Sequence, residues 1–436
     1  MIEYRNLRVA VLGGGSVGSQ VAALLLQHGE ELAARAGAGL ELVGVAVRNP
    51  DAPRDTDIPA HLITTDAESL ILGADIVVEL IGGIEPARTY ILQALNSGAD
   101  VITANKAVLA NHGPELFEAA EQVGAQLYYE AAVGGAIPII RPLRDSLAGD
   151  RVKRILGIVN GTTNYILDRM DTRGDELREA LAEATRLGYA EADPTADIGG
   201  FDAANKAAIL ASLAFHTTVS LDEVYCEGIT GVTGEQVRAA RKAGYVVKLL
   251  AICERITADG VEGVSARVHP ALVPLDHPLA AVHGANNAVF VEAEAAGSLM
   301  FYGAGAGGVE TASAVLGDLV SAARRHVAGG PGVAESTHAN LPVFPIASAI
   351  TRYQVTLEVN DEPGVLATIA QLFSDHSVSV EAVSQSVAGG QGAERPTATL
   401  VIVTHEAIES SLAATVASLT ASPVVASVVS VLRVEG

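Results

Sequence analysis

A glycine-rich turn near the start of the chain constrains the fold more than any other feature. The apolar run Leu7–Leu12 ends at Gly13-Gly-Gly-Ser-Val-Gly18, and a helical pattern follows from Ser19 to about His28. Glycines at this spacing allow a tight strand-to-helix turn and let a pyrophosphate approach the amides of the helix N-terminus. We therefore expect a dinucleotide-binding fold, although such a turn can also use glycines for packing alone. The expected cofactor contacts are Gly13, Gly15, Ser16, Val17 and Gly18.

Further strand–helix units follow and indicate a parallel sheet with helices on both faces. The next strands are expected at Leu40–Val47, Ile76–Ile81 and Asp100–Ala104. The first of these closes on Arg48. An arginine there can accommodate the 2′-phosphate of NADP, whereas an acidic residue would bind the ribose hydroxyl of NAD. Arg48 thus favours NADP, unless it is only a surface arginine. Lys106 lies just beyond a strand's carboxyl end, where such sheets bind ligands, or is a solvated lysine at a helix start.

Three carboxylates, Glu191, Asp193 and Asp197, precede a long apolar helix in the middle of the chain. Pro194 and the Gly199-Gly200 pair interrupt any helix in this stretch. We therefore expect these three acids to lie on an irregular loop.

Asp202 and Lys206 open the helix that follows, and the run from Ala207 to Phe215 carries no charge. Because the two residues are four apart, they lie on one face of the helix. Such a pair is commonly a solvated surface ion pair. An uncharged helix, however, is typical of one that is buried nearly all round. A lysine at its start would be partly desolvated and surrounded by acids, which suits proton transfer.

Charge and cysteine usage exclude several classes of protein. The net charge of −23 argues against a nucleic-acid partner, because binding phosphates needs clustered Lys and Arg. No stretch approaches the ~18 apolar residues of a membrane span, and the N-terminus leads into a strand without a signal peptide. Cys226 and Cys253 stand far apart in apolar surroundings. We expect two buried thiols and a cytoplasmic protein, without a disulfide framework.

Changes in pattern divide the 436 residues into three domains and a linker. Residues 1–135 form the α/β dinucleotide-binding domain, and a glycine-rich turn near residue 135 marks its boundary. Residues 136–330 form an α+β domain for substrate binding and dimerisation, whose last helix is expected to pack back on the first domain. Residues 331–349 have the composition of a linker. Residues 350–436 follow the order β-α-β-β-α-β, which is the ferredoxin-like arrangement.

Within the second domain, Gly303-Ala-Gly-Ala-Gly-Gly308 opens its last helix. This run is either a second close approach to cofactor or substrate, or a flexible turn.

Together these motifs resemble those of homoserine dehydrogenase over nearly the whole chain. The residues that carry the resemblance are Gly13–Gly18, Thr103–Lys106, Asn160–Tyr165, Gly188–Glu191 with Asp193-Pro194, and Phe201–Lys206. Asp361–Leu366 is similar to the start of an ACT domain, a regulatory module of amino-acid biosynthesis enzymes. The fold implied is a Rossmann domain, an α+β substrate domain and a C-terminal ACT domain.

The resemblance implies reversible NADP- or NAD-dependent reduction of L-aspartate 4-semialdehyde to L-homoserine. It implies that Lys206 is the proton donor and that Lys106 contacts cofactor and substrate. The implied substrate ligands are Glu191, Asp197 and Asp202, and the implied additional cofactor contacts are Thr103, Gly188 and Gly303. It further implies a sodium-like monovalent cation at Glu130, Val133, Gly135 and Ile137, a homodimer or homotetramer, and threonine as an effector at the ACT domain.

One residue departs from the family's pattern: Glu310 stands where the family usually has a proline after the glycine run. This puts the shape of the loop Gly303–Gly308 in doubt. Two other classes of protein stay open at this point. Another NADP-dependent dehydrogenase would not be expected to combine Glu191, Asp202 and Lys206. A non-catalytic sensor with an ACT domain would tolerate the loss of Lys206.

Overall fold

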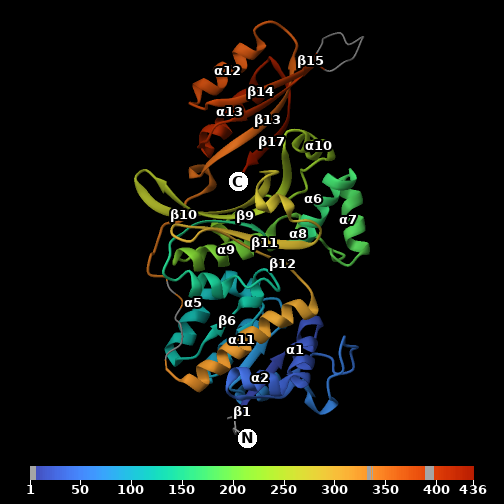
Figure 1. Ribbon diagram of the computed structural model, residues 1–436, viewed down its shortest axis with the longest axis vertical. Helices are drawn as coiled ribbons and strands as arrows, with labels where there is room; N and C mark the ends of the chain where they lie inside the picture. Colours follow the sequence, from blue (N-terminus) through green and yellow to red (C-terminus); the bar gives the residue numbers. More distant parts are fainter. Residues whose placement is uncertain (1–5, 331–334, 336, 388–396) are drawn as a thin grey trace. The chain divides into compact units, whose positions relative to one another are not determined.

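The computed structural model describes residues 6–330, 335, 337–387 and 397–436 (Figure 1). The chain separates into two compact units. The first comprises Met1–Gly161, Asp202–Asp222 and Ala285–Leu341, and the second comprises Thr162–Phe201, Glu223–Gly284 and Pro342–Gly436. Of the expected linker, residues 331–334 and 336 lie outside the described residues. No helix of the described chain is long and apolar enough to cross a membrane.

The first unit contains a six-stranded parallel sheet in the order β3-β2-β1-β4-β5-β6. Its strands are β1 (Asn6–Leu12), β2 (Gly39–Ala46), β3 (Ile63–Thr64), β4 (Ile76–Glu79), β5 (Asp100–Thr103) and β6 (Leu127–Tyr128). Every residue of β4 and β5 is buried, as expected of strands covered on both faces. The strand order is that of a dinucleotide-binding fold, so the predicted Rossmann architecture is confirmed.

Helices from both ends of the first unit's sequence accompany this sheet. They are α1 (Ser16–Gln27), α2 (Gly29–Ala36), α3 (Ala67–Leu72), α4 (Ala87–Asn96), α5 (Lys106–Val123) and α11 (Gly308–Ala328). Figure 1 shows α11 running beside α1, although the two are far apart in sequence. Val315 and Leu319 of α11 share one apolar core with Val9 of the sheet and Leu25 of α1.

The first unit also contains the helix that carries Asp202 and Lys206. This helix, α9 (Phe201–Phe215), is buried along most of its length, as predicted from its lack of charge. Three antiparallel strands belong to the same unit: β7 (Val152–Ile158), β11 (Asn286–Ala293) and β12 (Gly297–Ala304). The sequence did not predict β12. Its last residues, Gly303 and Ala304, are strand and not the start of a loop.

The second unit is built around the long hairpin of β9 (Tyr245–Ala258) and β10 (Val261–Pro274). A short strand, β8 (Tyr225–Cys226), pairs in parallel with β10. Its helices are α6 (Gly161–Arg173), α7 (Leu177–Arg186), α8 (Thr195–Ile198) and α10 (Gly234–Lys242). Two predictions are wrong in this region. Asp197 lies in the single turn of α8 and not on an irregular loop, and Cys226 is half-buried, unlike the fully buried Cys253.

The C-terminal residues form the predicted ferredoxin-like module, with strands in the antiparallel order β17-β13-β15-β14. Its elements are β13 (Ile350–Asn360), α12 (Val365–Asp375), β14 (Val380–Val387), β15 (Thr397–Thr404), β16 (Ala407–Ile408), α13 (Glu409–Ala421) and β17 (Val425–Val434). One apolar core joins the sheet to both helices, with Leu357 and Leu400 packed against Phe373 and Leu412.

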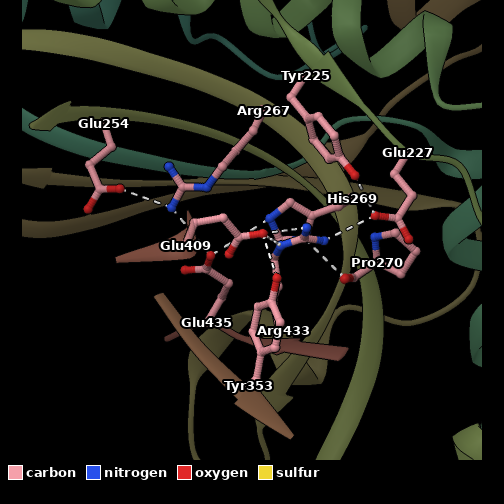
Figure 2. A network of polar contacts seen from close by, with 10 residues as sticks. All are labelled: Tyr225, Glu227, Glu254, Arg267, His269, Pro270, Tyr353, Glu409, Arg433 and Glu435. Carbon is pink, nitrogen blue, oxygen red and sulfur yellow. Dashed lines mark hydrogen bonds and ion pairs between the residues drawn. The ribbon is translucent and has the colours of Figure 1, made fainter. Parts of the chain in front are cut away.

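The last strand of this module also pairs with the hairpin of the second unit. Residues Arg433 and Val434 of β17 run parallel to Ala271 and Leu272 of β10. This pairing carries charged side chains into the interior, and Figure 2 shows the resulting network around Arg267 and Arg433. The C-terminal module is thus joined to the hairpin by main-chain hydrogen bonds and by ion pairs.

Candidate active site

The glycine turn that follows β1 leaves open space at one of its three motif glycines. A Cβ added at Gly13, whose φ is 105°, would lie 2.5 Å from the carbonyl oxygen of Leu80, and one at Gly18 would lie 1.9 Å from that of Gly13. These two glycines are therefore required by the chain's own packing. A Cβ at Gly15 would meet no described atom within 4 Å. The space over Gly15, the residue before the first turn of α1, is therefore open among the described residues.

The N-terminus of α11 meets the same turn. A Cβ added at Gly308 would lie 2.8 Å from Oγ of Ser16, so the first turns of α1 and α11 are in contact. Two helix N-termini at one place favour an anion such as a pyrophosphate. Glu310, which replaces the family's proline, folds back over Gly307, because its Oε2 would lie 2.1 Å from a Cβ there. Gly307 has φ of 137°, which also requires glycine.

Arg48 is exposed just after β2, as the sequence indicated. A second arginine lies at the glycine turn and was missed by the sequence reasoning. Nε of Arg54 would lie 3.2 Å from a Cβ at Gly14, and its guanidinium donates to the carbonyls of Asn49, Pro50 and Ala52. Arg54 therefore fixes the loop that follows Arg48.

The carboxyl ends of β4 and β5 present a connected set of polar groups that ends at Lys106. The hydroxyl of Thr103 donates to Glu79 at 2.6 Å and accepts the backbone N–H of Asn105. Burial is the largest influence on Glu79 and raises the pKa of this fully buried carboxyl. The side chain of Asn105 caps α5 by accepting the N–H of Val108, which places Lys106 on the first turn.

Lys206, Asp202 and Lys106 form one cluster in the first unit. Nζ of Lys206 donates to Oδ2 of Asp202 at 2.7 Å and to the carbonyl oxygen of Val159 at 2.6 Å. Nζ of Lys106 lies 3.0 Å from Oδ1 of Asp202. Asn160 donates its side-chain amide to Oδ2 of Asp202 at 2.9 Å. The predicted pair on one helix face is therefore extended by a second lysine and by Asn160, which belongs to a motif of the family resemblance but had no assigned role.

The charged groups of this cluster differ in their burial and in their electrostatic surroundings. Burial alone would raise the pKa of Asp202, but the charges of Lys206 and Lys106 and hydrogen bonds from Lys206 and Asn160 hold it well below its ordinary value. Asp202 therefore stays ionised across the neutral range. The side chain of Lys206 is 11% exposed and that of Lys106 is 42% exposed. Lys206 is thus the cation held in the more desolvated place.

The remaining predicted substrate residues belong to the second unit. Gly188 and Glu191 are exposed, and Asp197 is half-buried in α8. The loop that carries Gly188 and Glu191 is held on α6, because the hydroxyl of Thr162 donates to the carbonyl of Tyr189 at 2.7 Å. The two sequence motifs that carried the family resemblance therefore meet in space.

The carboxylate of Glu130 accepts hydrogen bonds from several groups of the same chain. Its oxygens accept the backbone N–H groups of Ile139, Ile140 and Arg141 at 2.6–3.0 Å and Nε of Arg141 at 2.9 Å. The predicted cation loop continues through Val133, Gly135 and Ile137, which are buried, while Gly303 on β12 packs against Ile137. No group of three or more His, Cys, Asp or Glu side chains that can hold a metal occurs among the described residues.

A cavity of about 320 Å³ lies between α5 and α9. Leu109 and Phe117 of α5 and Ile209 and Leu213 of α9 line it. None of the predicted site residues is among its lining residues, so the chemistry is not placed there.

Three families of known proteins match the chain in order along its length. The family described as "Homoserine dehydrogenase, NAD binding domain" matches residues 13–130, "Homoserine dehydrogenase" matches residues 138–320, and "ACT domain" matches residues 353–423. These matches contain the glycine turn, the lysine cluster and the C-terminal module, respectively.

Individual relatives match over most or all of the chain. A homoserine dehydrogenase of Mycobacterium tuberculosis is 56% identical over 437 residues, covering 100% of this chain and 99% of that protein. The crystal structure of a homoserine dehydrogenase from Thiobacillus denitrificans superposes with a TM-score of 0.90 at 39% identity, covering 99% of each chain. A hyperthermophilic archaeal homoserine dehydrogenase mutant in complex with NADPH matches with a TM-score of 0.61 at 26% identity, covering 75% of this chain and 99% of that one.

Proposed function

Because the chain belongs to the homoserine dehydrogenase family, and is thus an NAD(P)-dependent oxidoreductase acting on a CH–OH group, we propose that Lys206, Asp202 and Lys106 form its catalytic centre. The reaction is the reversible reduction of L-aspartate 4-semialdehyde to L-homoserine. The observation that supports this placement is the pair of hydrogen bonds that holds Nζ of Lys206 between Asp202 and the carbonyl of Val159.

Lys206 is the proposed proton donor to the aldehyde oxygen. A lysine ammonium has three N–H donors. Two of those of Lys206 are taken by Asp202 and Val159, which leaves one for the substrate. When the reduced cofactor is bound, it supplies the hydride that reaches the carbonyl carbon. A cationic donor at the oxygen offsets the negative charge that builds there at the same moment.

Asp202 holds the two lysines in this proposal. Its oxygens contact Lys206, Asn160 and Lys106, which leaves about one of roughly four lone-pair positions. The predicted contact between Asp202 and the substrate's ammonium remains a proposal, in which Asp202 is a secondary partner of that ammonium. Glu191, which is exposed, keeps its proposed role as a partner of that ammonium by family resemblance. Asp197 keeps the same proposed role by family resemblance alone.

The cofactor is proposed to be NADP, bound with its pyrophosphate over Gly15 and its 2′-phosphate at Arg48. The meeting of the first turns of α1 and α11 supports the first placement, and the exposed position of Arg48 after β2 supports the second. The hydroxyl of Thr103 is already shared by Glu79 and Asn105, so its proposed part is to shape the edge of the sheet. Gly188 keeps its proposed place at the cofactor by family resemblance alone.

Replacing Arg48 by alanine is expected to weaken NADPH binding tenfold to a hundredfold and to leave NADH nearly unchanged. The reason is that only NADPH carries the 2′-phosphate, and a charge-assisted hydrogen bond is worth ~1.5–3 kcal/mol. The measurement is cofactor oxidation with aspartate semialdehyde, with NADH and NADPH titrated side by side. Arg35→Ala, which removes an exposed arginine on α2, serves as the control. Equal losses for both cofactors would show that Arg48 does not bind this phosphate.

A monovalent cation is proposed at the loop Glu130–Ile137. The carboxylate of Glu130 is neutralised by Arg141 and satisfied by four N–H groups, so Glu130 is better suited to offer its backbone carbonyl. The donor set is then the carbonyl oxygens of Glu130, Val133, Gly135 and Ile137. Carbonyl oxygens suit hard cations, and a set without net charge favours sodium over a divalent ion. The cation would hold this loop, which packs on Gly303 and Gly305.

The ACT module is proposed to bind threonine and to inhibit the enzyme. Contacts within the second unit support a route for this effect. Arg433 of β17 lies 3.0 Å from Glu227, next to Cys226, whose thiol donates to the carbonyl of Gly199 at 3.4 Å. Gly199 stands three residues before Asp202 in the chain. A shift of β17 would therefore reach the segment that leads into α9. The alternative is a module that only stabilises an oligomer.

Threonine inhibition is expected to weaken at least tenfold in Leu366→Glu, with kcat unchanged in the absence of threonine. Leu366 is exposed on the first turn of α12, where free amides suit an amino-acid carboxylate and an added carboxylate would repel it. Gln371→Glu adds the same charge further along this helix and is the control. If the wild-type enzyme is not inhibited by threonine, the module stabilises the assembly or responds to a different ligand.

A homo-oligomer, dimer or tetramer, is proposed from the exposed apolar side chains of β12. Met300 is 37% exposed and Tyr302 is 56% exposed on this strand. Burial of such a surface is the usual driving force of subunit association. A cytoplasmic location is proposed because neither Cys226 nor Cys253 is part of a disulfide bond.

A further inference from the structure

The end of β7 contacts the lysine cluster through two successive residues. The carbonyl oxygen of Val159 accepts a hydrogen bond from Lys206 at 2.6 Å, and the side-chain amide of Asn160 donates to Asp202 at 2.9 Å. Asn160 is only 6% exposed. The oxygen of Asp202 that receives the amide is Oδ2, which also binds Lys206. The amide and the ammonium are therefore two donors on one oxygen atom.

The backbone that carries Asn160 is held from both sides. Before it, Ile158 of β7 is paired with Ala288 of β11. After it, a Cβ added at Gly161 would lie 2.5 Å from the carbonyl oxygen of Ala285. Only glycine permits this close approach, so Asn160 stands between a paired strand and a tightly packed turn. Its amide is consequently presented to Asp202 by a rigid segment and not by a loop that adjusts to it.

We propose that Asn160 is a positioning residue of the dehydrogenase reaction, whose amide orients the carboxylate of Asp202 so that it holds Lys206 and Lys106 together. The role rests on the proposed function of Lys206 as the proton donor. Asn160 does not touch the reacting atoms. It acts by fixing which oxygen of Asp202 faces which lysine, and therefore where the third N–H of Lys206 points.

The amide also moderates how tightly Asp202 holds the proton of Lys206. Within the cluster, the described charged groups that face one another are Lys106 on α5 and Asp202 and Lys206 on α9. A neutral donor on Oδ2 withdraws part of the negative charge from the side facing Lys206. Without it, the carboxylate would bind the ammonium more strongly. Homoserine oxidation needs Lys206 in its neutral form to accept the alcohol proton, so this direction should then require a higher pH.

The test measures homoserine oxidation with NADP⁺ from pH 6 to pH 11 in Asn160→Ala and Asn160→Asp. We expect Asn160→Ala to lower kcat at neutral pH about tenfold, the lower end for a hydrogen bond to a charged group. The rising limb of the pH profile should move up by about half a unit or more. Asn160→Asp keeps the shape of the side chain but adds a second carboxylate. The rising limb of its pH profile should therefore move further towards high pH. The KM for NADP⁺ should stay unchanged.

Two further variants make the outcomes distinct. Asn111→Ala removes an exposed amide of α5 that donates to the carbonyl of Ala107, and its pH profile should match wild type. Lys206→Ala is measured alongside. If Lys206→Ala loses activity while both Asn160 variants keep wild-type kcat and an unshifted limb, the positioning role of Asn160 is overturned. If Lys206→Ala keeps wild-type activity, the proposed proton donor fails first, and the role of Asn160 fails with it.

Discussion

Replacing Lys206 by alanine is expected to lower kcat for aspartate semialdehyde reduction by roughly 10²–10⁴, the range for a positioned general acid. Among the described groups of the cluster, the ammonium of Lys206 combines an N–H left for the substrate with a buried position, since its side chain is 11% exposed. Its removal takes away the proton and the charge that stabilises the oxyanion. Cofactor affinity should change little, because the proposed pyrophosphate site at Gly15 is built from other elements.

Lys153→Ala is the matched control, because it removes an exposed lysine from β7 that has no part in the cluster. Both variants are assayed for kcat and for NADPH affinity at the same pH. Asp202 should not contribute to the pH dependence of the reaction in the neutral range, because its lowered pKa keeps it ionised. If Lys206→Ala keeps more than about a tenth of wild-type turnover, the mechanism needs a different acid.

The pairing of Asp202 with Lys206 could be predicted because it depends only on helix geometry. Residues four apart on a helix face each other, and the observed distance of 2.7 Å follows from that rule. The glycine turn could be predicted for the same reason, since its spacing is local. Both features were available without knowing how distant segments pack.

Contacts between distant segments could not be predicted in this way. Lys106 approaches Asp202, and Asn160 approaches the same carboxylate, only because α5, α9 and the end of β7 are brought together by tertiary packing. The residue pattern left Lys106 as either a ligand-binding residue or a solvated lysine, and the family resemblance favoured the first. Asn160 belonged to a motif that carried the resemblance, but no role was assigned to its amide.

Local rules also failed where two of them compete. Pro194 was interpreted as a helix breaker, yet proline is well suited to the start of a helix, and it precedes the single turn of α8 that contains Asp197. The strand β12 was missed because its end coincides with a glycine run, which resembles a loop. The implied cation ligand Glu130 gave no sign in the sequence that its carboxylate is occupied by backbone N–H groups.

Because Arg267 takes part in the buried ion pairs shown in Figure 2, we expect its replacement to be among the most destabilising substitutions in the second unit. Arg267 is 0% exposed, and its Nη2 lies 2.9 Å from Glu254 and 3.3 Å from Glu435. Burial alone would lower the pKa of Arg267, but these carboxylates raise it, so the guanidinium stays charged. The carboxylate of Glu435 is 3% exposed and cannot exchange this partner for water.

Arg267→Met is therefore expected to lower the free energy of unfolding by about 3–5 kcal/mol, since it removes the arginine that faces the buried carboxylate of Glu435. The double variant Arg267→Met with Glu435→Gln should recover part of this loss, because it removes the buried negative charge as well. Urea unfolding followed by circular dichroism measures both. Arg238→Met, which breaks an exposed ion pair with Glu176, should cost under about 1 kcal/mol. A single variant as stable as this control would mean that the buried ion pairs of Arg267 contribute little to holding the C-terminal module to the hairpin.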